Sequence, residues 1–153
     1  MRNRGMLVMK IALGCDHGGY DLKLHVMETL KKLGHEYEDF GCDSKDSCDY
    51  SDFGAPAAQA VADGRCDMGI VLCTTGIGIS IAANKIKGIR CAHCADAYEA
   101  ELCRRHNDAN VMAIGAGFTG PFLADRMVEI FLTTEHEGGR HARRVGKIMA
   151  LEG

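Results

Sequence analysis

The sequence predicts an α/β fold: a three-layer αβα sandwich around a doubly wound, five-stranded parallel sheet, followed by a C-terminal helix. Short apolar runs alternate along the chain with longer stretches in which apolar residues recur every three or four positions. Most connections between them are short. This alternation of strands and helices is typical of a mostly parallel, Rossmann-like sheet with helices on both faces.

The individual elements follow from local signals. Between residues 20 and 33 the apolar residues stand at steps of four and three, and Gly34 is well placed to end that helix. Asp96, with Glu99 three residues on, predicts a helix start, and Thr119 can cap the helix after it. Strands are expected at 8–13, 36–40, 68–73, 89–93 and 110–114. Helices are expected at 20–33, 55–62, from 77, 96–105, 119–132 and 140–151.

The composition is ordinary for one domain of 153 residues, with 46% hydrophobic and 25% charged residues. We expect residues 1–8 to be an extension and 9–153 to be the domain. The formal net charge of −3 gives no general attraction to nucleic acid or anionic membranes. No apolar run approaches the roughly 20 residues that span a bilayer.

Eight cysteines are spread through this pattern, and the N-terminus has no apolar stretch long enough for a signal peptide. This usage favours reduced thiols in the cytoplasm over a disulfide framework. Cys91, His93 and Cys94 superficially suggest a zinc site. They fall in a predicted strand, where adjacent side chains point to opposite faces, and a second ligand pair is missing. We expect neither a metal nor a cofactor.

The stretch 68–85 (MGIVLCTTGIGISIAANK) carries the main chemical signal. A buried strand ends at Cys73, a loop with two threonines and two glycines follows, and a helix begins near Ile77. Glycines let backbone N–H groups approach a ligand, and a helix N-terminus favours anions and thiolates. The stretch offers a base or nucleophile beside an oxyanion hole. The alternative is a buried cysteine in a nucleotide-binding turn, although neither a dinucleotide fingerprint nor a P-loop is present.

Other polar residues stand at the ends of predicted strands. Asp16 and His17 follow the first strand, at the edge where Cys73 ends the third and where ligands bind in such sheets. His106 and Asn107 instead precede the fifth strand. One chain should therefore hold them far from Cys73, which suggests that they serve the site of a neighbouring subunit.

These residues fall in four separated motifs that resemble the type B ribose-5-phosphate isomerase family over residues 9–151. The motifs are GCDHGG at 14–19, CTTGIGISIAANK at 73–85, RRHNDANV at 104–111 and EGGRHARRV at 137–145. The resemblance implies cofactor-independent interconversion of ribose 5-phosphate and ribulose 5-phosphate in homodimers or homotetramers with shared sites. A related branch isomerises hexose 6-phosphates such as galactose 6-phosphate, and allose 6-phosphate is a further alternative.

The resemblance also implies catalytic roles. One branch of the family uses a cysteine at the end of the third strand as base, and the other uses a glutamate six residues later. Here Cys73 is present and the later position is Ile79, as in the cysteine branch. Thr75 can shuttle a proton between substrate oxygens. His106 suits opening of the sugar ring, with Asn107 orienting the substrate. The alternative for His106 is a surface histidine that closes a helix.

The substrate-binding residues are expected around these groups. Arg140 and Arg144 lie four residues apart on one helix face and suit a phosphate, although Arg143 and Lys147 form a second such pair and a solvated face is the alternative. Many relatives have a phosphate-binding arginine where this chain has Gly117. The remaining histidines, His141 among them, carry no predicted role. The other expected substrate contacts are Asp16, His17, Tyr50, Thr74, Gly76, Ile77 and Gly78, and Asp16 with His17 are alternatively a helix-capping turn.

Overall fold

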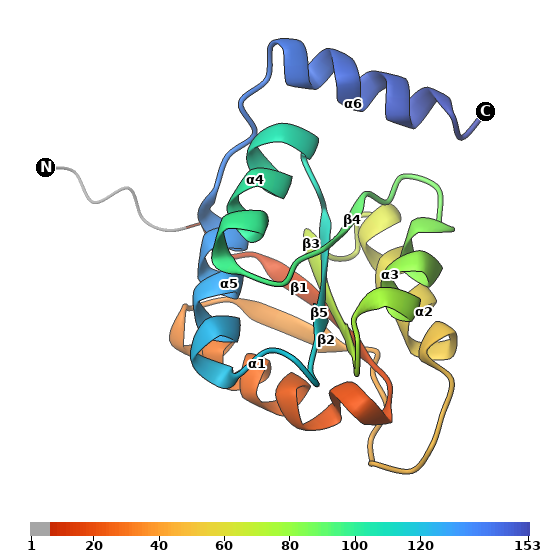
Figure 1. Cartoon of the computed structure of the whole chain (residues 1–153), viewed down its shortest axis with the longest axis vertical. Coiled ribbons are helices and arrows are strands. Elements are labelled where there is room, and N and C mark those ends of the chain that lie inside the picture. Colours follow the sequence, from red (N-terminus) through yellow and green to blue (C-terminus); the bar gives the residue numbers. More distant parts are fainter. Residues whose placement is uncertain (1–6) are drawn as a thin grey trace, which may run out of the picture.

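The protein is described by a computed structural model that covers residues 7–153. A sheet of five strands lies between two layers of helices (Figure 1). The strands are β1 Lys10–Cys15, β2 Glu36–Asp39, β3 Met68–Cys73, β4 Cys91–His93 and β5 Val111–Gly115. The helices are the 3-10 turn η1 His17–Gly19 and α1 Tyr20–Lys32, α2 Tyr50–Ala62, α3 Ile77–Asn84, α4 Ala97–Asn107, α5 Pro121–Thr133 and α6 Arg140–Ala150.

The sheet has the strand order β2-β1-β3-β5-β4, and every neighbouring pair is parallel. β3 is central, and all six of its residues are buried. Its register with β5 pairs Gly69 with Val111 and Cys73 with Gly115. The predicted five-stranded parallel sheet is confirmed, and all strands end at one edge, where ligands bind in this architecture.

Each face of the sheet has its own hydrophobic core. One core packs α1, α4 and α5 against the sheet through residues such as Val26, Met127 and Phe131. The other packs α2 and α3 through smaller residues such as Ala57 and Ala83. Small side chains let α2 lie close to α3: a Cβ added to Gly54 would come within 2.5 Å of Ile79. Helices thus cover both faces, as predicted (Figure 1).

The terminal helix α6 belongs to neither layer. It runs across the edge at which the strands begin, opposite their carboxyl ends (Figure 1). His141 is its only buried residue. The far end of α6 is held by the Glu152 carboxylate, which accepts hydrogen bonds from the amide of Gly88, and by Met149 Sδ, which accepts one from Arg90. Most of this helix is therefore open to solvent.

Several element boundaries differ from the prediction, and β4 begins at Cys91 rather than at residue 89. α2 begins at Tyr50 rather than at residue 55. The sequence of the added turn is polar and contains Gly54, but this glycine is buried against Ile79 of α3 and the packing favours a helix. α4 continues through His106 to Asn107, where Asp108 at φ 46° ends it; 106–109 is thus not wholly a loop. α5 begins at Pro121 with Gly120 in the N-cap position, so Thr119 is not its cap.

The start of the chain was predicted to be an extension over residues 1–8. Residues 1–6 of this segment lie outside the described residues. Leu7 and Val8 are exposed, and β1 begins at Lys10, two residues later than predicted. Among residues 7–153, no helix combines the length and apolar character needed to cross a membrane.

Candidate active site

Cys73 ends the central strand and points its thiol into the loop that leads to α3. Cys73 is buried, with 4% of its surface exposed to solvent. The Gly76 amide donates a hydrogen bond to Sγ of Cys73 at 3.1 Å. A thiolate accepts such a bond more strongly than a thiol does, so this contact favours the form of cysteine that can remove a proton. Thr75 Oγ1 lies 4.0 Å from the same sulfur.

The backbone of the loop is shaped by Gly76, which has φ 75° and precedes the first residue of α3. A Cβ at this position would come within 2.7 Å of the Gly115 amide nitrogen, so the loop packs directly on the end of β5. Thr75 Oγ1 accepts a hydrogen bond from the Ile77 amide at 3.1 Å. The positive dipole end of α3 therefore follows directly on the cysteine loop, and the Gly76 and Ile77 amides there are bonded to Cys73 and Thr75.

Asp16 and His17 lie at the same edge, after β1. The Asp16 carboxylate accepts hydrogen bonds from the amides of Gly18 and Gly19 at 2.9 and 3.2 Å, so it caps η1. His17 Nδ1 accepts a hydrogen bond from the Cys48 amide at 3.2 Å. This bond leaves the proton of a neutral His17 on Nε2, which is free to donate. The capping role of Asp16 is present, and it does not preclude contact with a substrate.

The remaining predicted binding residues surround the loop. The Tyr50 ring lies over Gly78: a Cβ there would come within 2.6 Å of the ring. Tyr50 lies on the first turn of α2, before the predicted start of this helix at residue 55, and it borders the site. Thr74 Oγ1 packs against Gly18, which joins the β1 and β3 loops. Ile77 is half exposed at the start of α3.

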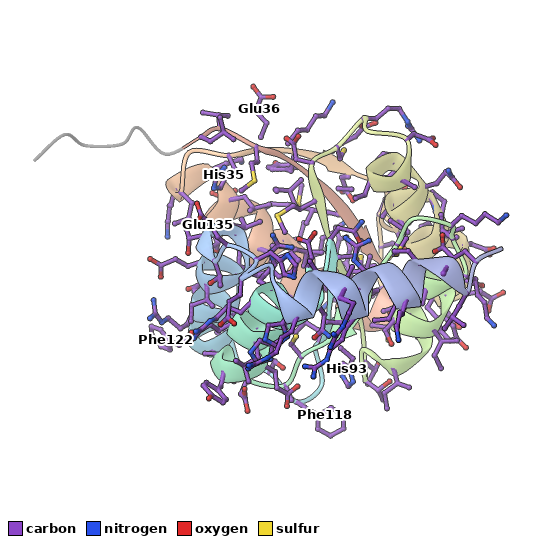
Figure 2. All side chains as sticks on the ribbon, turned by 90° about the horizontal axis from the view of Figure 1, so that it is seen from above. His35, Glu36, His93, Phe118, Phe122 and Glu135 are labelled. Atoms are coloured by element: carbon purple, nitrogen blue, oxygen red, sulfur yellow. The ribbon has the colours of Figure 1, made fainter. Side chains whose placement is uncertain are left out.

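A cleft of about 410 Å³ opens beside Thr75 and Ile77. Its wall includes two residues without a predicted role, His93 at the end of β4 and Phe118 after β5. Figure 2 shows both side chains at the same margin of the molecule. His93 also lies against Gly76, since a Cβ there would meet its ring at 2.8 Å. The position of His93 at the end of a predicted strand was the signal that could have found it.

His106 and Asn107 lie at the opposite edge, as predicted. They end α4, which leads into the start of β5. The strand pairing places Val111 beside Gly69, four residues before Cys73. Four residues of strand span about 13 Å. One chain therefore does not bring His106 to Cys73.

The two arginines predicted to bind phosphate lie in the first half of α6, at the same edge of the sheet as His106. Arg140 and Arg144 are both exposed, and in the part of the chain that the structure describes neither forms an ion pair. Asn107 lines a separate cleft of about 300 Å³ beneath α6, together with Arg90 and Ile148. The positive groups and the His106 end of α4 thus form a second cluster of site residues.

His106 also has a partner that the sequence did not suggest. Its ring stacks on that of His141, with centroids 4.3 Å apart and 6° between the planes. His141 Nε2 lies 3.4 Å from the Glu137 carboxylate. Glu137 and His141 stand four residues apart, but Glu137 precedes α6, so helical spacing does not link them in the sequence.

The charge states of this cluster follow from its neighbours. Burial lowers the pKa of His141, and the nearby charges of His106 and Arg140 lower it further. Burial raises the pKa of Glu137, but hydrogen bonds and charge from Arg105 outweigh it, so the net pKa lies below its usual value. A neutral imidazole beside a carboxylate is therefore the expected state at neutral pH. Among the described residues, His106, Glu137 and His141 are the one group of three side chains that could hold a metal ion.

Comparisons with known proteins identify the family of this chain. The family described as Ribose/Galactose Isomerase matches residues 11–148. Ribose-5-phosphate isomerase B of Escherichia coli is 47% identical over 143 residues, which cover 94% of this chain and 96% of that protein. D-erythrulose-4-phosphate isomerase of Pectobacterium atrosepticum is 40% identical over 142 residues, covering 92% and 93%.

The solved structure of ribose-5-phosphate isomerase B from Clostridium thermocellum superposes with a TM-score of 0.93. It is 53% identical, and the match covers 94% of this chain and 97% of that one. Fold, motifs and nearly full-length similarity therefore agree. The chain belongs to the Ribose/Galactose Isomerase family.

Proposed function

We propose that the protein interconverts ribose 5-phosphate and ribulose 5-phosphate without a cofactor. The observation that carries the proposal is the Cys73 thiol at the end of the central strand, which accepts the Gly76 hydrogen bond and lies 4.0 Å from Oγ1 of Thr75, a residue that lines the open cleft. The similarity to ribose-5-phosphate isomerases B supports the substrate. An aldose–ketose isomerase needs a base and stabilisation of an enediolate, and the Cys73 loop offers both.

In the proposed mechanism the Cys73 thiolate removes the proton from C2 of the open-chain aldose. The electron pair left on C2 forms the C1–C2 double bond of the enediolate, and the charge moves to O1. Amides at the start of α3 stabilise that charge. Thr75 moves a proton between O2 and O1, and the Cys73 thiol returns its proton to C1. The product is the ketose, and no atom is gained or lost.

Ring opening and phosphate binding are assigned to a second subunit of a homodimer. His106 gives a proton to the ring oxygen as its bond to C1 breaks, the C1 hydroxyl loses its proton to solvent to form the aldehyde, and Asn107 orients the sugar. Arg140 and Arg144 bind the phosphate dianion, because free guanidinium groups on one helix face suit its oxygens. Asp16, His17 and Tyr50 complete the wall from the Cys73 side. The separation of about 13 Å along the strands supports this division between subunits.

The second candidate substrate is a hexose 6-phosphate, since the family description includes galactose. The relative from Pectobacterium is named for a four-carbon sugar phosphate, so chain length varies among similar proteins. Gly117 lacks the phosphate-binding side chain that relatives with arginine have at this position. The preferred length of the sugar phosphate can therefore differ from theirs. The Gly117 amide bonds Thr74 O at 2.9 Å, and a side chain there would begin 3.0 Å from that oxygen.

The test is an activity screen with ribose 5-phosphate, allose 6-phosphate, galactose 6-phosphate and erythrulose 4-phosphate. We expect the highest kcat/KM for ribose 5-phosphate. A higher value for a hexose phosphate would reassign the substrate. Turnover of none, with thermal stabilisation by nucleotides, would favour a non-catalytic nucleotide-binding domain. We also propose that residues 9–153 act as one domain and that the enzyme works in the cytoplasm.

A further inference from the structure

We propose that His106, Glu137 and His141 form a binding site for a divalent transition metal ion of the zinc type. Two imidazoles and a carboxylate are donors that such ions prefer, and three protein ligands leave a position open for water. The potential ligand atoms of the three side chains all lie within 4.8 Å of one another. The isomerase reaction proposed above does not require a metal ion.

His141 provides the first observation that points to a ligand. Its residue is 7% exposed, and its Nε2 atom is buried without a hydrogen-bond partner among the described residues. A buried polar atom of this kind normally has a partner.

The position of Glu137 is the second observation. One carboxylate oxygen, Oε1, is engaged by Arg105, at 2.8 Å from Nε and 2.7 Å from Nη2. The other oxygen, Oε2, lies 3.4 Å from His141 Nε2, and no hydrogen bond joins the two atoms. Two ligands of a tetrahedral zinc ion, each at about 2.0–2.1 Å, stand about 3.4 Å apart. Oε2 and Nε2 therefore already have the separation of a ligand pair.

His106 supplies the third ligand. Its ring is parallel to that of His141 and in contact with it, so a rotation about its side-chain bonds brings a nitrogen to the same ion. His106 is half-buried at the end of α4. Arg140 and Arg144 lie nearby and oppose a cation. They are exposed, so solvent and salt screen them and their effect is a weaker affinity.

Metal binding would have a consequence that rests on the proposed function. If His106 opens the sugar ring, an ion that holds its imidazole nitrogen removes it from proton transfer. The metal would then act as an inhibitor competing with protons and substrate for the same cluster. Binding itself does not depend on this role, so the two statements can be tested separately.

The binding test uses the metal-free full-length protein and cobalt(II), whose visible spectrum reports its ligands. We expect one ion per chain with tetrahedral nitrogen and oxygen ligation and without the charge-transfer band of a thiolate. Glu137→Gln and His141→Gln should weaken binding at least about tenfold, since even indirect metal partners contribute that much. His136→Gln, at a neighbouring histidine outside the group, is the matched control and should bind as the wild type does.

Unchanged affinity in Glu137→Gln and His141→Gln, or ligation by thiolates alone, would overturn the proposal. Should His141→Gln fail to fold, Glu137→Gln carries the test, because the Glu137 side chain is at the surface and 35% exposed. The inhibition test compares isomerase activity with and without cobalt(II) in the wild type and in Glu137→Gln, which should resist inhibition. Binding as expected without inhibition would support the metal site and count against the role given to His106.

Discussion

The amide of Gly76 donates its hydrogen bond to Sγ of Cys73, so the residue that begins the α3 turn also holds the proposed base. The same glycine packs on the end of β5 and against His93. The base, the helix N-terminus and two strand ends are thus one connected unit. Substitution of Cys73 should affect catalysis alone, whereas substitution of Gly76 should affect both stability and catalysis.

Replacing Cys73 with serine is expected to abolish isomerisation and leave the fold intact. Serine fits the space of cysteine, but its hydroxyl is a far weaker acid and supplies almost no anion to remove the C2 proton. General-base catalysis contributes about 10²–10⁴-fold, so kcat should fall by at least about 10²-fold. Steady-state kinetics and thermal unfolding measure the two effects. Wild-type turnover in this variant would show that Cys73 is not the base.

Replacing Gly76 with alanine should lower both stability and activity. The residue has φ 75°, and the new Cβ would meet backbone atoms of Ile114 and Gly115 at 2.7–2.8 Å. Strain of this kind costs about 1–3 kcal/mol. The matched control is Gly34→Ala, which has φ 83° and open space around it. It should lose only about 1–2 kcal/mol of unfolding free energy and keep its kcat. Equal activity in both variants would contradict the role of the loop.

Much of this arrangement could be predicted from the sequence. Apolar periodicity located all five strands, and Asp96 caps α4 as expected: its carboxylate accepts the Glu99 amide at 2.7 Å. Gly34 follows α1 at positive φ, as expected. What could not be predicted depends on contacts between distant segments. The early start of α2 depends on the packing of Gly54 against α3.

The candidate site divides in the same way. The place of Cys73, Thr75 and Asp16 at one edge could be predicted, because strand ends and glycine turns mark an edge of a parallel sheet. His141 and Glu137 were missed, because their relation to His106 arises only when the segment before α6 folds back onto α4. The return is held by the Glu137 amide, which donates to Arg105 O at 3.0 Å, and by the ion pair between Arg105 and the Glu137 carboxylate. Local sequence patterns carry no signal for such a contact.

Replacing Arg140 or Arg144 with alanine should act mainly on the binding of phosphate-bearing substrates. Loss of a charged hydrogen-bond partner costs about 1.5–3 kcal/mol, so KM should rise about 10- to 100-fold with a smaller change in kcat. Inhibition by free phosphate should weaken in parallel. Arg143→Ala, which removes an exposed arginine of α6 outside the predicted phosphate-binding pair, is the matched control. If phosphate inhibits all three variants as it inhibits the wild type, Arg140 and Arg144 do not bind phosphate and are only part of a solvated helix face.

His35 should make the protein less stable in mild acid. It is buried, its Nδ1 accepts a hydrogen bond from the Met9 amide, and burial lowers its pKa below 6.5. In the unfolded chain, His35 is therefore protonated near pH 6.5, whereas in the folded protein it remains neutral until the pH is lower. The free energy of unfolding should fall as pH drops below 6.5, until the folded pKa is reached. His141 adds a change of the same sign.

The measurement for His35 is urea unfolding between pH 7.5 and about 5. His35→Gln cannot take up the proton, but its amide oxygen can accept the Met9 hydrogen bond, so its stability should depend less on pH than that of the wild type. His93→Gln, at an exposed histidine, is the control and should retain the wild-type slope. The same slope in His35→Gln as in the wild type would assign the acid sensitivity to other groups.

The last prediction is that His106 completes the site of a second subunit. Cys73 lies after its strand and His106 before the next one, so a two-fold dimer is needed to bring them together, and it would form two equivalent sites. Cys73→Ser and His106→Ala should each be nearly inactive alone. When the two variants are mixed and their subunits exchange, each heterodimer has one site with both lesions and one with neither. Such a dimer should recover up to half of the wild-type activity. Exchange that is verified by mass spectrometry but restores no activity would mean that each chain builds its site alone, and the assignment of His106 to the partner would be wrong.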